Sequence, residues 1–204
     1  MFSKHDPWCT KADLKNYDPQ FRPKQVRRRA DEVLQMRNYF LMDAACPVAL
    51  QQALDPQKVF VAGFSYGAAT AALCCVREPQ SFVGAVLIDG WFHISLPKLK
   101  PSPFFLDFPE EVHAAGLPCP ALFIGSEQFS KDRGLNAATQ RLAGPNKSVV
   151  LPGTLHGNFQ EAAVAWFPPW LTRLVGAVGP ADAEATFKTI LELTVGFFKQ
   201  QISK

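Results

Sequence analysis

Residues 59–67 have the sequence Val-Phe-Val-Ala-Gly-Phe-Ser-Tyr-Gly, and this stretch decides the fold. Residues 59–64 are apolar without polar alternation, which is typical of a parallel strand covered on both faces. A helix is predicted to follow from Tyr66 to about Val76. A Gly-x-Ser-x-Gly pattern at a turn from strand to helix predicts a nucleophilic serine, so Ser65 is the candidate nucleophile at the C-terminal edge of a sheet.

The residues around this serine support the prediction. A sharp turn from strand to helix crowds its neighbours, and Gly63 and Gly67 are expected to relieve that crowding. The backbone N–H of Tyr66 would lie at the helix N-terminus, where it could stabilise a developing oxyanion. The alternative is that Ser65 is a helix N-cap flanked by glycines by chance, but the strand before it and the helix after it favour the nucleophile.

Further apolar runs indicate the rest of a sheet. Strands are predicted at residues 85–88, 121–124 and 148–151. Helices are predicted at residues 24–45, 162–178 and 182–202, the second of them broken or kinked by Pro168-Pro169. Strands separated by longer segments imply parallel crossover connections, so the predicted fold class is α/β with a doubly wound, mostly parallel sheet.

Length and composition fit one folded domain. The chain has 204 residues, of which 48% are hydrophobic and 12% aromatic, enough for an ordinary core. Residues 1–22 are polar and interrupted by prolines, so they are predicted to be irregular, and residues 23–204 are predicted to form a single α/β domain.

Charge, cysteines and hydropathy exclude several classes. A net charge of +3 and a pI near 8.6 do not provide the basic surface of a nucleic-acid partner. The five cysteines are scattered without Cys-x-x-Cys spacing, so free thiols are expected, with no metal and no cofactor. No signal-peptide stretch or apolar membrane span is present in the sequence as given, so a cytoplasmic location is expected, and a secreted longer parent is left open.

A serine nucleophile requires a base that titrates near neutrality. Of the four histidines, His156 follows the last predicted strand in a loop, where a doubly wound hydrolase presents its base. His5 lies in the irregular start, His93 lies too near the nucleophile in sequence, and His113 lies in a polar amphipathic segment. His156 is therefore the candidate base, and the other three histidines are expected to be structural.

The acid that orients the base should lie between serine and histidine in the chain. Asp89 ends the 85–88 strand, where a buried carboxylate would need a compensating partner such as an imidazolium. Glu127 follows the 121–124 strand and Asp107 lies between the two strands, so both remain rivals. The residues favour Asp89 without excluding these two.

Several segments taken together resemble a known family, the platelet-activating factor acetylhydrolases, which are calcium-independent phospholipases of α/β-hydrolase fold. The resemblance covers about residues 21–167, and more loosely the remainder, through the segments KQVRRRA (24–30), GFSYGAAT (63–70), IDGW (88–91), FIGSEQF (123–129) and LHGNF (155–159). It implies that Asp89 completes a triad with Ser65 and His156. It also implies a metal-free hydrolysis of short or oxidised sn-2 acyl groups of phospholipids through an acyl-Ser65 intermediate.

The sequence differs from this family in two ways. Three positions carry other residues than the family usually has: Phe64 stands in place of a histidine, Ala68 in place of a glycine, and Gly90 in place of an alanine. The family also has early strands, and a loop with a second oxyanion donor, before the matched part, and nothing before Val59 predicts them. We therefore expect the 59–64 strand to be exposed along one edge. Another carboxylesterase or lipase of this fold, or a catalytically silent fragment, remains an alternative function.

An aromatic cluster near the C-terminus indicates a lipid contact as one interpretation. Residues 166–171 have the sequence Trp-Phe-Pro-Pro-Trp-Leu and are followed by Arg173. Aromatic side chains beside a cation suit the headgroup boundary of a lipid surface, and core packing explains them equally well. The oligomeric state is not predicted.

Overall fold

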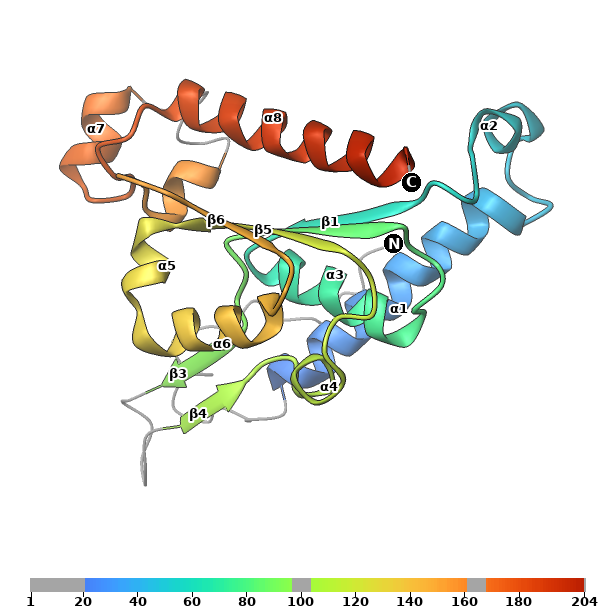
Figure 1. Ribbon diagram of the computed structural model, residues 1–204, viewed down its shortest axis with the longest axis horizontal. Coiled ribbons are helices and arrows are strands. Elements are labelled where there is room, and N and C mark those ends of the chain that lie inside the picture. Colours follow the sequence, from blue (N-terminus) through green and yellow to red (C-terminus); the bar gives the residue numbers. More distant parts are fainter. Residues whose placement is uncertain (1–20, 97–103, 161–167, 204) are drawn as a thin grey trace.

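The computed structural model describes residues 21–96, 104–160 and 168–203. Its centre is a parallel sheet with the strand order β1-β2-β5-β6, in which the strands are β1 (Phe60–Phe64), β2 (Gly84–Ile88), β5 (Ala121–Ser126) and β6 (Lys147–Leu151) (Figure 1). Each strand lies within two residues of a predicted one. The predicted α/β fold class with a parallel sheet is therefore confirmed.

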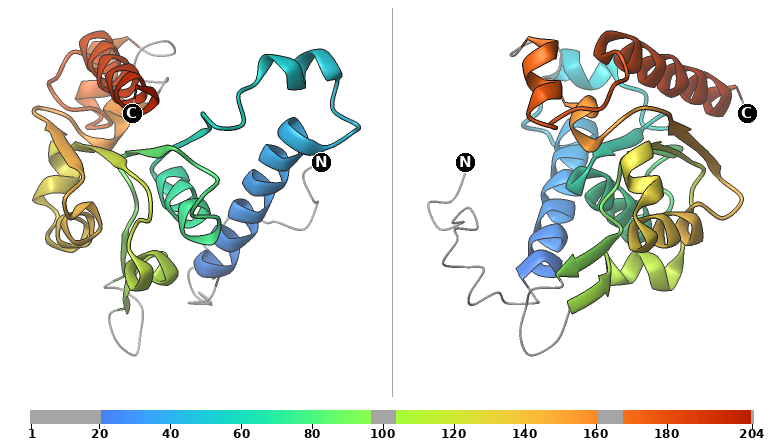
Figure 2. Two further views of the ribbon diagram at one scale, coloured as in Figure 1. Left: turned by 45° about the vertical axis from the view of Figure 1, so that its right-hand side comes forward. Right: turned by 90° about the vertical axis from the view of Figure 1, so that its left-hand side faces the viewer.

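Helices cover both faces of this sheet. The helices are α1 (Phe21–Met42), α2 (Val48–Ala53), α3 (Tyr66–Arg77), α4 (Glu110–Ala115), α5 (Glu127–Lys131), α6 (Arg133–Ala143), α7 (Pro169–Leu174) and α8 (Ala183–Ile202). Helix α8 lies over one face, and α1, α3, α4 and α6 lie on the other, as the turned views also show (Figure 2). Two apolar clusters fill the two sides and hold the strands in place.

The sequence predicts α3 and α8 well and α1 and α7 with other bounds, and it does not predict α2, α4, α5 or α6. Helix α1 begins at Phe21 rather than Lys24, because Pro23 is tolerated in a first helical turn. Most of the predicted irregular segment 1–22, and residues 162–167 of the predicted 162–178 helix, lie outside the described residues. In the part of the chain that is described, no helix is both long and apolar enough to cross a membrane.

A β-hairpin was not predicted. Strands β3 (His93–Leu96) and β4 (Phe104–Asp107) pair antiparallel and form a separate small sheet. The hairpin projects from the sheet edge that bears the C-terminal ends of the parallel strands, because β3 follows β2 closely. It adds a layer beside α6 rather than a strand to the main sheet (Figure 1).

Strand β1 forms one edge of the described parallel sheet, as expected. The N–H of Ser65 donates to the carbonyl of Ile88 at 2.8 Å, so alternate residues of β1 direct their backbone groups toward β2. The N–H and C=O groups of Phe60, Ala62 and Phe64 consequently point away from β2, toward the open edge. Ala62 is exposed there.

Candidate active site

Ser65 lies in the tight turn between β1 and α3. Its backbone has φ 57° and ψ −120°, a left-handed conformation that is costly for a residue with a side chain. A Cβ at Gly63 would lie 2.1 Å from the carbonyl oxygen of Gly67, so only glycine fits at position 63. At Gly67 the corresponding space is open, so the prediction that both glycines relieve crowding is right for Gly63 alone.

Asp89 follows β2 and is almost fully buried, with 2% of its surface exposed. Its φ is 44°, again in the left-handed region, which turns the side chain toward the edge of the sheet. One carboxylate oxygen, Oδ1, accepts the backbone N–H of Ser126 at 2.7 Å. That bond satisfies one side of a buried charge and leaves the other oxygen for a second partner.

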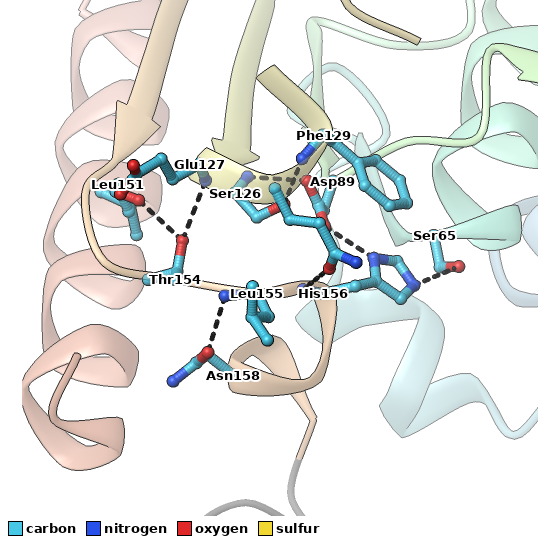
Figure 3. A network of polar contacts seen from close by, with 11 residues as sticks. Ser65, Asp89, Ser126, Glu127, Phe129, Leu151, Thr154, Leu155, His156 and Asn158 are labelled. Carbon is cyan, nitrogen blue, oxygen red and sulfur yellow. Dashed lines mark hydrogen bonds and ion pairs between the residues drawn. The ribbon is translucent and has the colours of Figure 1, made fainter. Parts of the chain in front are cut away.

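His156 lies between Asp89 and Ser65 (Figure 3). Its Nδ1 is 2.6 Å from Asp89 Oδ2, and its Nε2 is 2.9 Å from Ser65 Oγ. Because the carboxylate can only accept, Nδ1 carries the proton in the neutral form of the ring, and Nε2 then presents its lone pair to the serine hydroxyl. The structure therefore brings the predicted serine, histidine and aspartate into one hydrogen-bonded chain.

The loop that carries His156 is fixed by buried polar side chains. Asn158 is fully buried, and its Oδ1 accepts the N–H groups of Leu155 and Gly179 at 2.8 and 2.7 Å. The Thr154 hydroxyl donates to the carbonyl of Leu151 at 2.6 Å and accepts the N–H of Glu127. These bonds set the backbone of the short 3₁₀ helix His156–Phe159, and with it the position of the imidazole.

Sequence reasoning did not assign roles to several residues that support this site. The Gln128 side-chain oxygen accepts the backbone N–H of His156 at 2.8 Å, and Ser126 donates to Asp89 as described. The one signal in the sequence for these supporting residues was that they lie in the segments 123–129 and 155–159, which carry the family resemblance. Their contacts depend on the pairing of β5 with β6 and could not be read from either segment alone.

The rival carboxylates have other partners. Glu127 accepts the N–H of Gly153 at 2.5 Å and forms an ion pair with Lys131. The Lys131 hydrogen bond, followed by the Gly153 bond, lowers the pKa of Glu127. Its carboxylate thus ties α5 to the loop after β6, and the structure does not place it against the imidazole.

Asp107 and the other described histidines form a separate group. His93 Nδ1 lies 3.0 Å from Asp107 Oδ1, and Arg141 pairs with the other oxygen of that carboxylate. Burial acts to raise the pKa of Asp107, but the His93 hydrogen bond and nearby positive charges hold it below its ordinary value. His113 Nε2 lies 2.9 Å from the Phe92 carbonyl, and burial lowers its pKa. His5 lies outside the described residues.

Tyr66 occupies the first position of α3, so its N–H lies at the positive end of the helix, as the oxyanion prediction requires. Its ring stacks on Phe108 with centroids 5.6 Å apart. The guanidinium carbons of Arg22 and Arg29 lie 5.6 and 5.0 Å from the centroid of the Tyr66 ring. Two cations of α1 are therefore grouped beside the residue that follows the candidate nucleophile.

The thiols take no part in this arrangement. Cys46, Cys74, Cys75 and Cys119 are free and buried, as expected, and Cys9 lies outside the described residues. Burial raises the pKa of Cys74 to about 12, which keeps that thiol protonated and inert. Among the described residues no three His, Cys, Asp or Glu side chains form a group that could hold a metal ion.

Taken together, a parallel sheet, a strained serine between strand and helix, and a histidine loop after the last strand define the chain as an α/β hydrolase. Residues 40–204 match the family model described as "Platelet-activating factor acetylhydrolase, isoform II". The chain belongs to this family, as the sequence resemblance predicted.

Two curated relatives carry the same name. The platelet-activating factor acetylhydrolase of Cavia porcellus is 24% identical over 92% of this chain and 42% of the relative. That of Canis lupus familiaris is 26% identical over 76% of this chain and 35% of the relative. The chain thus spans less than half the length of the curated relatives that it matches.

Solved structures give weaker matches. One described as LipS and LipT, two metagenome-derived lipolytic enzymes, has a TM-score of 0.43 and 13% identity, covering 86% of this chain and 78% of that chain. SOBER1 of Arabidopsis thaliana has a TM-score of 0.36 and 14% identity, covering 65% of this chain and 54% of that chain. Similarity at this level does not indicate a particular activity.

Proposed function

We propose that this protein is a serine esterase that hydrolyses the short or oxidised sn-2 acyl group of platelet-activating factor-like phospholipids. The observation that carries the proposal is the hydrogen-bonded chain from Ser65 Oγ through His156 to buried Asp89. Membership of the acetylhydrolase family supports the ester and phospholipid parts of it. No metal or cofactor is required for this chemistry.

The proposed reaction has two halves. In the first, His156 Nε2 takes the Ser65 proton as Oγ attacks the ester carbonyl, and the Tyr66 N–H stabilises the oxyanion. The imidazolium, paired with Asp89, then gives that proton to the departing glycerol oxygen and leaves acyl-Ser65. In the second half, water loses a proton to His156, attacks the acyl group and regenerates the serine hydroxyl.

The cations beside Tyr66 support a phosphate-bearing substrate. Arg29 is exposed, and its guanidinium faces the Tyr66 ring next to the nucleophile. Arginine binds phosphate oxygens through paired N–H groups, so we propose Arg29 and Arg22 as the residues that attract a phospholipid headgroup. A neutral soluble ester would not use this contact.

Helix α7 supports docking at a lipid surface. The described part of the predicted aromatic cluster begins at Pro168, and Trp166 and Phe167 lie outside it. Trp170 is 66% exposed, and Leu174 and Val175 are 75% and 67% exposed. Exposed apolar side chains with Arg173 nearby suit the headgroup boundary of a lipid surface.

The test is labelling of purified protein with a fluorophosphonate, together with Ser65→Ala. Labelling of the wild type that is lost in the variant is expected. Hydrolysis is then compared for a phospholipid with an sn-2 acetyl group, the same lipid with a long sn-2 chain, and p-nitrophenyl acetate. Labelling without any preference for the short-chain phospholipid would favour another carboxylesterase or lipase of this fold.

The open edge of β1 favours a second candidate, a folded protein with little or no turnover. The nucleophile strand has a neighbour on one side only within the described sheet, and Tyr66 is the one oxyanion donor assigned to this chain. Loss of an oxyanion donor typically lowers turnover about a hundred- to a thousandfold. A soluble, folded wild type that never reacts with the fluorophosphonate would support this candidate.

A further inference from the structure

The imidazole of His156 lies between two phenylalanine rings. The ring centroids of Phe64 and His156 are 4.7 Å apart with planes inclined by 24°. Those of Phe129 and His156 are 4.6 Å apart and nearly parallel, at 8°. Phe64 comes from the end of β1 and Phe129 from α5, so two separate elements contribute to this aromatic sandwich (Figure 3 shows the Phe129 side).

We propose that Phe64 and Phe129 are positioning residues that fix the plane of the His156 ring and stabilise its protonated form during turnover. The inference rests on the proposed function and deepens it, because it explains how the candidate base is held and tuned. Neither ring is assigned a contact with the substrate.

The sandwich fixes the ring plane because both useful hydrogen bonds of His156 lie in that plane. Rotation about the bond between Cβ and the imidazole is soft in an isolated histidine. Here a rotation would drive the ring edges into Phe64 or Phe129 and would break the bonds to Asp89 and Ser65 together. The two rings therefore reduce the orientational freedom that would otherwise oppose the reaction.

The sandwich also distinguishes the two charge states of the imidazole. An aromatic face carries partial negative charge and attracts a cation more strongly than a neutral ring. His156 is neutral before the attack and becomes positive as it takes the serine proton. The contact thus strengthens on the way to the transition state, which is the condition for it to raise kcat.

The charged groups near the imidazole either favour its protonated form or are compensated by partners of their own. The described charged group in direct contact with the ring is Asp89, which also favours the cation. Glu127 on α5 is paired with Lys131 and the Gly153 N–H, so its charge is largely compensated. Substitution of Phe64 or Phe129 by leucine leaves all of these groups in place and removes only the aromatic face.

The experiment measures kcat, KM and the pH dependence of kcat/KM with p-nitrophenyl acetate for Phe64→Leu and Phe129→Leu. Each variant is expected to lose about three- to tenfold in kcat, with KM within about twofold. The acidic inflection of the profile is expected to move about half a unit to lower pH, because the imidazolium has lost a favourable contact. Phe129→Tyr, which keeps the ring, should restore both values.

Phe197→Leu is the matched control, since Phe197 is buried on the same face of the sheet as Phe64 but does not stack on His156. It is expected to lower Tm without moving the inflection. Leucine variants that keep the wild-type kcat and inflection, or a Phe197→Leu variant that shifts the inflection as much, would overturn the inference. A wild type inert toward both the fluorophosphonate and the ester would instead refute the proposed function.

Discussion

Replacement of Asp89 by asparagine tests the assignment of the acid most directly. The carboxylate is buried, and its Oδ2 lies 2.6 Å from His156 Nδ1, so it would stabilise an imidazolium at close range. Two unit charges about 4 Å apart at an effective dielectric constant of about 20 attract by about 4 kcal/mol. At about 1.4 kcal/mol per power of ten, loss of that charge costs about a thousandfold in kcat, and misorientation of the ring adds to it, giving about 10³–10⁴.

The fold should survive this change, because an asparagine side-chain oxygen can still accept the N–H of Ser126. Thermal unfolding is expected to give a Tm within roughly 5 °C of the wild type. The activity assay is p-nitrophenyl acetate hydrolysis at saturating substrate, with Glu127→Gln as the control for the rival carboxylate. Glu127→Gln should keep kcat within about threefold, since its amide oxygen can still accept the Gly153 N–H.

The reasoning fails if Asp89→Asn keeps more than about a tenth of the wild-type kcat in a folded protein. It fails equally if Glu127→Gln is the more damaging of the two substitutions. Either result would show that the hydrogen bond between Asp89 and His156 is not what orients the base.

The remaining predictions concern headgroup, surface, backbone and pH. Arg29→Gln should lower kcat/KM at least fivefold, or about 1 kcal/mol, on a short sn-2 phospholipid but not on p-nitrophenyl acetate. The control Arg28→Gln, at a residue that pairs with Glu32, should change kcat/KM for neither substrate. Equal losses with both substrates in Arg29→Gln would count against a phosphate contact. Trp170→Ala should reduce sedimentation with anionic liposomes and leave soluble-ester activity intact; loss of both would indicate a packing role. Gly63→Ala should lower stability by about 1–3 kcal/mol and abolish labelling, because a methyl group would overlap the next turn; a wild-type urea midpoint would contradict this. The rate should increase with pH on the acidic side, because only the unprotonated imidazole can take the serine proton, and a flat profile would remove His156 from the role of base.

The parallel sheet could be predicted because each strand is a short apolar run bounded by polar chain. The turn at Ser65 could be predicted because glycine at position 63 and the order of strand and helix are local features. The position of His156 followed from the rule that the carboxyl ends of parallel strands meet at one edge of a sheet, whereas the same rule left Glu127 as a rival to Asp89 until the family resemblance favoured Asp89. Their catalytic roles stay predictions until the variants are measured.

The hairpin and the supporting contacts could not be predicted in the same way. Residues 93–107 contain several prolines and no clear alternation, and β3 and β4 become strands only by pairing with each other. Helix α5 is a single short turn that starts directly from β5, with the Ser126 side chain accepting the N–H of Phe129 as its cap. The ring stack on His156 joins three segments distant in sequence, so no local pattern indicates it.

Because of the left-handed backbone at Ser65, stability of the fold and catalysis make opposite demands on this position. Strain of this kind costs of order 1–3 kcal/mol, and glycine adopts the same dihedral angles without that penalty. Ser65→Gly is therefore expected to raise the free energy of unfolding while it removes the reactive oxygen. The residue that suits this turn best is therefore not the residue that the proposed reaction needs.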